Sequence, residues 1–303
     1  GFKRLYLKDR EIKNLILMGD FLTETIFREE RQDNIITRAE FEKRYENTVY
    51  KTETSLSEEM DIDPEYAALI VPTMVICKDF MDLFNAEALW MPGVSLLDGI
   101  AYDFGEKKNF IKSAHNFEND ILVAARNIAK RYSTGKDHIK GTTDLALAIF
   151  DSMKKVHGMG SRERLLLQIA ALLHDCGKYI SMVNLGECSY AIIMATEIIG
   201  LSHREREIVA NIVRYNHLEF DYSMENSEGI DREEYLTIVK LTAILQIANA
   251  LDRSHKQKCR DIKAVRKDDK LILTITTNED ITLERGLFGS RAEFFREVYS
   301  IEP

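Results

Sequence analysis

A histidine and an aspartate that are adjacent in the sequence are the residues best suited to chemistry. His174 and Asp175 follow the apolar run at 165–173 and precede Gly177 and Lys178. An ionisable pair at the end of a buried helix is costly unless it has partners. A divalent cation is one such partner, because imidazole and carboxylate are both metal ligands. We therefore interpret the pair as a candidate metal site, where Gly177 ends the helix in a left-handed cap and Lys178 can bind a phosphate oxygen.

Further ligands for such a site are expected upstream and downstream of the pair. His138 opens the preceding helical segment, and "LQIANALDRSH" at 245–255 is the expected place of the last ligand. A histidine, then the His174-Asp175 pair, then an acidic residue at the end of a late helix form a pattern that resembles the HD phosphohydrolase superfamily. The resemblance implies a divalent metal, Mg²⁺ or Mn²⁺, held by these side chains.

The late helix departs from that pattern. Metal-binding members of the superfamily carry Ala-Asp where this chain has Ala248-Asn249, and an amide is a weaker metal ligand than a carboxylate. Asp252, one turn further on, can substitute for Asn249 only if the helix rotates. The predicted ligands are therefore His138, His174, Asp175 and Asn249, with Asp252 as the substitute. The alternative is a core pair at His174 and Asp175 that is satisfied by hydrogen bonds and holds no metal.

Three styles of sequence follow one another and predict three domains. Residues 1–110 alternate short apolar runs with helical segments, which is typical of an α/β layer. Residues 111–258 show a three-to-four-residue periodicity throughout, which predicts an α-helical bundle with 162–178 in its centre. Residues 259–303 alternate polar and apolar residues and predict a small α+β meander. Its strands are expected at 261–266, 270–277 and 280–284, and a helix at 291–299.

Turn and capping residues predict where several helices and strands of the first domain begin. Residues 14–27 are typical of a strand, a turn and a helix. Thr37 and Glu40 form a capping box that opens a helix predicted to run to about Ser57. Asp63 is expected to cap the next helix, with a proline at its first position.

Composition excludes some classes of protein. The chain has 303 residues and a net charge of −9, and none of its apolar runs approaches the ~18 residues that a membrane span needs. Its first residues do not form a secretory signal, so we expect a cytoplasmic protein. Four dispersed cysteines predict neither a disulfide framework nor a zinc ribbon.

The order of the segments carries a second resemblance. "NFENDILVAARNIAKRY", "LLLQIAALLHDCGKYI", "ILQIANALDRSH" and the closing meander resemble the carboxy-terminal half of the exopolyphosphatase / guanosine pentaphosphate phosphohydrolase (Ppx/GppA) family. "NLILMGD", "PEYAALIVPTMVICKDF" and "MPGVSLLDGIAYDF" extend the match into that family's second actin-like domain. The resemblance implies a mixed, mainly α fold: part of an actin-like domain at 1–110, an HD-type all-α bundle at 111–258, and the meander at 259–303.

The family resemblance also implies an activity. Members hydrolyse phosphoanhydride bonds of polyphosphate or guanosine pentaphosphate in a cleft between two actin-like domains, with a magnesium ion and glycine-rich phosphate loops. Most of that apparatus has no counterpart here, and the family's Gly-Gly turn reads Gly19-Asp20. We therefore expect a fragment of a longer protein, or a relative without the phosphatase half, and we assign no catalytic residue.

A set of basic and histidine side chains is expected at the same end of the bundle as the candidate metal site. They are Lys178, Arg214, His217, Arg253, His255 and Lys256. Together they could line a positive channel for a chain of phosphates. Arg253 and Lys256 could instead complement a helix dipole, and His217 could lie in a surface turn.

The leading hypothesis is the polyanion-binding and dimerising part of an exopolyphosphatase-like hydrolase. Its expected partners are polyphosphate or guanosine pentaphosphate and a second copy of the chain, without a membrane. Nucleic acid is a less favoured partner, because no aromatic residues interleave the basic stretch at 253–270. The alternatives are an autonomous metal-dependent HD phosphohydrolase and a non-catalytic module that binds a nucleotide or a partner chain.

Overall fold

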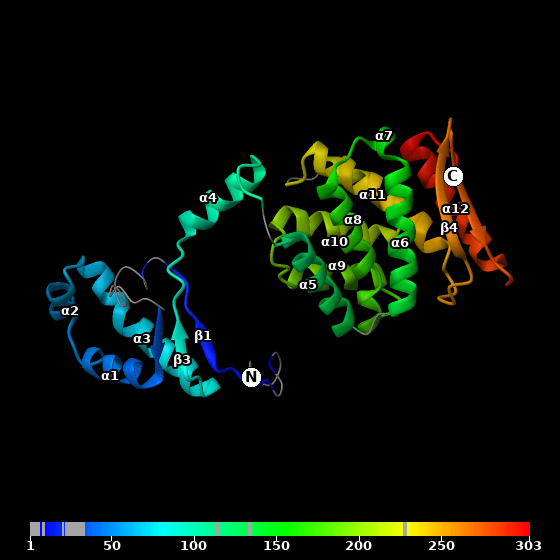
Figure 1. Cartoon of the computed structure of the whole chain (residues 1–303). Coiled ribbons are helices and arrows are strands. Elements are labelled where there is room, and N and C mark those ends of the chain that lie inside the picture. Colours follow the sequence, from blue (N-terminus) through cyan, green and yellow to red (C-terminus); the bar gives the residue numbers. More distant parts are fainter. Residues whose placement is uncertain are drawn as a thin grey trace. The chain divides into compact units, whose positions relative to one another are not determined.

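The computed structural model describes residues 7, 10–19, 21, 34–112, 115–132, 135–226 and 229–303. The chain divides into two compact units, Gly1–Ala114 and His115–Pro303, and helices dominate both (Figure 1). The fold is thus mainly α, as expected. In the described ranges, no helix combines the length and the apolar character needed to cross a membrane.

The described residues of the first unit form a small sheet and four helices. Its strands are β1 (Asn14–Ile16), β2 (Ile35–Thr37) and β3 (Ala88–Trp90). The central strand β3 pairs in parallel with β1 and antiparallel with β2. The helices are α1 (Arg38–Thr48), α2 (Glu53–Met60), α3 (Pro64–Phe84) and α4 (Leu96–Lys107). The helix predicted at 21–27 lies, apart from Phe21, outside the described residues.

The predicted helix starts in this unit are confirmed. Thr37 and Glu40 form the capping box of α1, and the Asp63 side chain caps α3. The single helix predicted to run to Ser57 is wrong, because α1 ends at Thr48 and a second helix starts after Thr52, whose hydroxyl accepts a hydrogen bond from the Ser55 amide. A new N-cap at Thr52 therefore divides the segment that periodicity predicted as one helix.

The second unit is a helical bundle. Its helices are α5 (Phe117–Arg131), α6 (Lys136–Ser152), α7 (Lys154–His157), α8 (Ser161–Leu173), α9 (Leu185–Ala195), α10 (His203–His217) and α11 (Arg232–Ala250). Two 3₁₀ helices, η3 (Cys176–Tyr179) and η4 (Tyr222–Asn226), join them. Helix α8 contacts α5, α6, α10 and α11, and Leu167, Ile169 and Leu173 on it are fully buried. The expectation that this helix occupies the centre of the bundle is confirmed.

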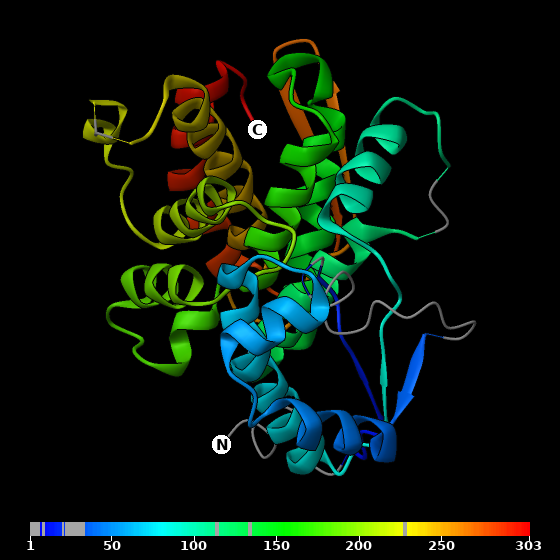
Figure 2. The same cartoon turned by 90° about the vertical axis from the view of Figure 1, so that its left-hand side faces the viewer.

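The chain ends in a hairpin and a helix that pack on the bundle. β4 (Arg260–Lys267) and β5 (Lys270–Thr276) pair antiparallel, and α12 (Thr282–Tyr299) packs along α11 (Figure 2). The third strand predicted at 280–284 is wrong, since helix α12 already begins there. The Asp280 carboxylate accepts hydrogen bonds from the amide and hydroxyl of Thr282 at 2.9 and 2.6 Å, a local turn that starts a helix. The helix predicted at 291–299 is the second half of α12.

Candidate metal and anion site

Two helices bring the predicted histidines together. His138 lies in the first turn of α6, and the His174-Asp175 pair follows the last residue of α8, against which α6 packs. His138, His174 and Asp175 each offer a ligand atom, and these atoms lie within 4.8 Å of one another. All three side chains are buried, with His174 at 0% exposure. Residues 36 positions apart thus form one polar cluster inside an apolar bundle.

Hydrogen bonds fix the orientation of both imidazoles. His174 Nδ1 lies 2.7 Å from the carbonyl oxygen of Ala171, and His138 Nδ1 lies 2.7 Å from Asp252 Oδ2. A carbonyl and an ionised carboxylate can only accept, so each Nδ1 carries the hydrogen. When a ring is neutral, its Nε2 is therefore unprotonated and faces the cluster.

The two Nε2 atoms face each other at 3.0 Å. In the neutral form of both rings the two lone pairs repel, and a shared proton or a metal ion between or beside them would remove the repulsion. The Asp175 carboxylate lies 3.7 Å from both nitrogens. Two neutral imidazoles and one carboxylate are a donor set suited to a divalent transition metal. The residues therefore fit Mn²⁺, one of the two ions that the HD resemblance implies, better than Mg²⁺, which prefers oxygen ligands.

The protonation states match this arrangement. Burial lowers the pKa of His174 to about 4, so the imidazole is neutral near pH 7, as a metal ligand must be. Burial opposes ionisation of the Asp175 carboxyl, but His174 and Lys178 outweigh it and hold the pKa of that carboxyl well below its usual range. The Lys178 ammonium donates a hydrogen bond to Asp175.

Asp252 lies on the outer side of this cluster. Its carboxylate contacts Nδ1 of His138, the nitrogen that faces away from His174, and it also accepts hydrogen bonds from the backbone and side chain of Gln257 at 2.8 and 3.1 Å. In this position it orients His138, as the outer carboxylate does in sites where a carboxylate, a histidine and a metal are linked. Helix α11 ends at Ala250, so Asp252 reaches His138 from the following turn without a rotation of the helix. Asn249 lines the neighbouring pocket.

The structure requires a glycine at position 177, but for a different reason from the predicted one. It lies in η3 and does not have a positive φ, so the left-handed cap expected there is wrong. A Cβ at this position would lie 2.5 Å from the carbonyl oxygen of Leu185 and 2.5 Å from Ser189 Oγ. Only glycine allows α9 to approach the turn that carries Asp175 and Lys178.

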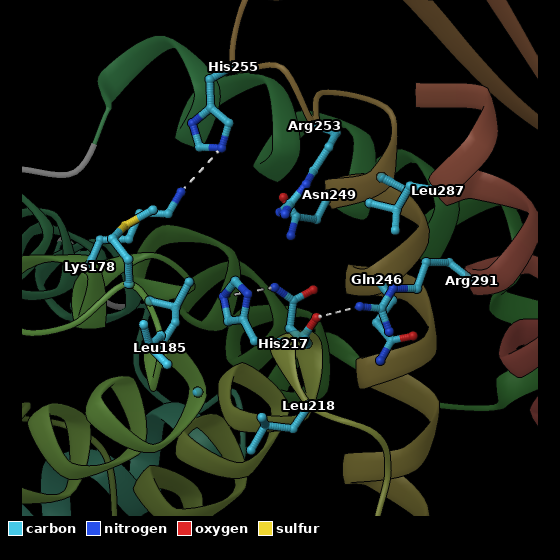
Figure 3. A pocket seen from close by; sticks show the side chains of 15 residues that line it. Lys178, Leu185, His217, Leu218, Gln246, Asn249, Arg253, His255, Leu287 and Arg291 are labelled. Atoms are coloured by element: carbon cyan, nitrogen blue, oxygen red, sulfur yellow. Dashed lines mark hydrogen bonds between the residues drawn. The ribbon is translucent and has the colours of Figure 1, made fainter. Parts of the chain in front are cut away.

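A pocket of about 550 Å³ adjoins the cluster, which is a common size for a small-molecule site. Lys178 enters it from one side, and Arg253 and Arg291 enter from the other (Figure 3). Amides of Asn216, Gln246 and Asn249 add polar lining. Among the described residues, no aspartate or glutamate lines the pocket. Its chemistry therefore favours an anion.

Three lining residues connect the pocket to the cluster of His138, His174 and Asp175. Lys178 bonds the Asp175 carboxylate, His217 Nε2 donates to the carbonyl oxygen of His174 at 2.7 Å, and the His255 ring stacks on His138 with centroids 3.6 Å apart. An anion in the pocket would therefore lie next to the cluster.

The unpaired positive charge of this pocket comes from Arg253 and Arg291, since Lys178 is paired with Asp175. Burial, with nearby His174, lowers the pKa of His217 to about 4, and burial, with nearby His138 and Lys178, lowers that of His255 to about 4. Both rings are neutral near pH 7, and the Nε2–H of His217 already donates a hydrogen bond to the carbonyl oxygen of His174. Burial and the charge of Arg253 lower the pKa of Arg291. Neither arginine forms a salt bridge with a described residue, and a bound anion would relieve their mutual repulsion.

The structure places four of the six predicted anion-binding residues around the pocket: Lys178, His217, Arg253 and His255. Arg214 instead pairs with Glu187 at 2.6 Å, its guanidinium over the Tyr190 ring, and Lys256 is exposed and outside the lining. Sequence reasoning missed Arg291. No local sequence signal predicted that this residue lines the pocket, because its position there depends on the packing of α12 along α11.

Comparison with known proteins assigns the class. The family model "Ppx/GppA phosphatase, domain III" matches residues 123–289, more than half of the chain. The chain therefore belongs to the Ppx/GppA phosphatase family, which confirms the resemblance of its segments. It is similar to the guanosine-5'-triphosphate,3'-diphosphate pyrophosphatase of Aliivibrio fischeri, with 23% identity over 221 residues that cover 70% of this chain and 42% of the relative. The match thus spans less than half the length of that curated relative.

Proposed function

We propose that the second unit holds the phosphates of a phosphoanhydride substrate, polyphosphate or guanosine pentaphosphate, in the pocket formed by Lys178, Arg253 and Arg291. The observation that supports this proposal most strongly is that three basic side chains line one pocket, while no carboxylate is among its described lining residues. Arginine and lysine bind phosphate by charge-assisted hydrogen bonds. Membership of the Ppx/GppA family and the activity for which the Aliivibrio relative is named support a substrate of this class.

A divalent metal, Mg²⁺ or Mn²⁺, would be held by His138, His174 and Asp175 beside these phosphates. Bound there, the ion would supply a Lewis acid for a phosphoryl oxygen. Asp252 would orient His138, and Lys178 would share its ammonium between Asp175 and the substrate. Asn249 would face the anion and not the metal, since it lines the pocket.

Binding without independent catalysis is the role we assign to this part of the protein, with hydrolysis completed by the family's actin-like domains. The second candidate is an autonomous HD phosphohydrolase, which is favoured by the assembled His138, His174 and Asp175 cluster. Phosphate release from polyphosphate in Mn²⁺ separates the two. Release that disappears in His174→Ala indicates autonomous catalysis, and no release from either protein supports the binding role.

The test of the leading proposal is titration calorimetry with polyphosphate. A charge-assisted hydrogen bond contributes about 1.5–3 kcal/mol, so Arg291→Gln should weaken binding by about tenfold or more. Lys256→Gln, which removes the same type of charge outside the pocket, should change it less than about twofold. Equal effects of the two substitutions would contradict the proposal and indicate diffuse attraction by surface charge.

A homodimer is the assembly we propose, formed through helices of the second unit. Light scattering on the purified chain measures its mass directly. A monomer at micromolar concentration would contradict the dimer and leave the anion site unaffected.

A further inference from the structure

A buried carboxylate that the candidate site does not use lies at the start of the last helix. Glu284 is in the first turn of α12, and only 1% of it is exposed. A glutamate is rarely buried to this degree unless it is paired. It belongs neither to the cluster of candidate metal ligands nor to the lining of the anion pocket. Its burial therefore needs a reason of its own.

The partners of this carboxylate belong to the turn that follows α11. One Glu284 oxygen accepts a hydrogen bond from the Ser254 amide at 3.2 Å, and the other lies 3.7 Å from the Lys258 ammonium. Burial opposes ionisation of Glu284, but hydrogen bonds from Ser254 and the charge of Lys258 hold the pKa of Glu284 below its ordinary value. The carboxylate is therefore ionised near pH 7, and it links α12 to the turn at 251–258.

This turn carries three groups of the candidate site. Asp252 and His255 both contact the His138 ring, the first by a hydrogen bond and the second by stacking. Arg253 lines the anion pocket. In Figure 3, Arg253 and His255 both extend from this turn toward the pocket. The amide at position 254 lies among the three, so one contact with it acts on all of them.

The backbone of the turn is strained and needs external support. His255 and Gln257 have φ angles of 55° and 49°, a region that residues with a side chain seldom adopt. Such conformations persist only where the surrounding structure holds them. Asp252 supplies part of this support from within the turn, because it accepts hydrogen bonds from the backbone and side chain of Gln257. Glu284 adds a contact from a different element and so fixes the turn against α12.

Electrostatic repulsion within the pocket increases the need for this contact. Arg291 on α12 and Arg253 in the turn both line the pocket, and the charge of Arg253 acts on Arg291. Without a bound anion, repulsion between the two guanidinium groups favours movement of the turn away from α12. The hydrogen bond from Ser254 to Glu284 opposes that movement.

We infer that Glu284 is a positioning residue for the anion pocket, which holds the turn after α11 so that Arg253 lies beside Arg291. The inference rests on the proposed function of this pocket. Helix α12 then serves the pocket twice, through Arg291 as a direct contact and through Glu284 as the anchor of a second contact.

The test compares Glu284→Gln with Glu284→Met, with tripolyphosphate as the probe in titration calorimetry. Both variants remove the negative charge, but only glutamine keeps a side-chain oxygen that can accept from the Ser254 amide. Glu284→Met should weaken tripolyphosphate binding by about tenfold, and Glu284→Gln by less than about twofold. Loss of the charge alone would strengthen anion binding in both variants. Weakening in the methionine variant alone therefore identifies the hydrogen bond as the cause.

A double-mutant cycle separates positioning from a general loosening of α12. Arg253→Gln should weaken binding by about tenfold in the parent protein and by less than about twofold in Glu284→Met, whereas Arg291→Gln should have the same effect in both. Arg291 is on the same helix as Glu284, so a defect of the whole helix would change both cycles. Helicity and thermal midpoint show that each variant is folded.

A second readout needs no bound anion. The Nδ1–H of His138 bonds Asp252 in the same turn, so its proton NMR signal should shift or broaden in Glu284→Met and stay in place in Glu284→Gln. Equal tripolyphosphate affinities of the two variants, additive effects of Glu284→Met and Arg253→Gln, or an unchanged His138 signal in Glu284→Met would overturn the inference. If the parent protein does not bind tripolyphosphate, the proposed function of the pocket fails, and the NMR comparison alone decides the role of Glu284.

Discussion

At the scale of single residues, the site depends on which nitrogen of each imidazole carries the hydrogen. His174 and His138 both donate from Nδ1, so both direct Nε2 toward Asp175. The sequence predicted these three residues by their types and spacing. It did not predict the role of Asp252, because whether this carboxylate meets a metal or a ligand depends on the turn after α11.

Asp252→Asn should weaken Mn²⁺ binding by about 10–100-fold, since an outer carboxylate fixes the ring and raises the basicity of the ligand. Isothermal titration with Mn²⁺ measures the change. Asp269→Asn, an exposed position away from the cluster, is the matched control and should leave affinity unchanged. If the two variants bind equally, Asp252 has no such role.

His157, remote from the metal cluster in the sequence, gives a pH prediction of its own. Its Nε2 donates to the Phe150 carbonyl and its Nδ1 accepts from the Met159 amide, both at 2.9 Å, so the buried ring is neutral. Burial lowers its pKa. Below about pH 6.5 the unfolded chain therefore binds a proton that the folded one does not, and stability is lost as the pH falls.

The expected result is that His157→Gln reduces this pH dependence. Between about pH 7.5 and about pH 5.5, the free energy of unfolding should fall by about 1 kcal/mol less in the variant than in the parent protein. Urea unfolding followed by circular dichroism measures the difference. His203→Gln, at an exposed helix start, should keep the parent slope. An unchanged slope in His157→Gln would show that this ring does not contribute.

At the scale of elements, capping residues and periodicity predicted where helices lie. They did not predict the features that depend on how the elements pack together. Helix α10 spans 203–217, inside the region whose three-to-four-residue periodicity predicted a helical bundle. The segment at 280–284 was predicted as a strand because it alternates, yet helix α12 begins at Thr282, directly after the turn at Asp280, and Glu284 is buried at 1% exposure. Arg291 reaches the anion pocket only because this longer helix lies along α11.

Gly177 tests the contact between η3 and α9. Gly177→Ala should lower the free energy of unfolding by about 1–3 kcal/mol, because the new methyl group overlaps the Leu185 carbonyl oxygen and Ser189. Gly141→Ala, inside α6 with no atom within 4 Å of the added carbon, should raise it by up to about 1 kcal/mol. Urea unfolding of both variants decides. A tolerated alanine at 177 would mean that the close approach is not required.

At the scale of the whole molecule, charge is distributed unevenly. The chain carries 50 acidic and 41 basic residues, yet the pocket beside His174 and Asp175 is lined by Lys178, Arg253 and Arg291. Net charge therefore said little about what binds, whereas the folded arrangement of η3, α11 and α12 brings these positive groups together. Family membership was predictable from the order of the segments, and it did not depend on any one site residue.

The central claim is that phosphates lie among Lys178, Arg253 and Arg291 beside a metal held by His138, His174 and Asp175. The most direct measurement is a crystal structure with Mn²⁺ and tripolyphosphate, read by anomalous scattering of the metal. We expect an anomalous peak between the two Nε2 atoms and Asp175, with phosphate density in the adjoining pocket. Metal or phosphate bound elsewhere, with this cluster and pocket holding only water, would contradict the account.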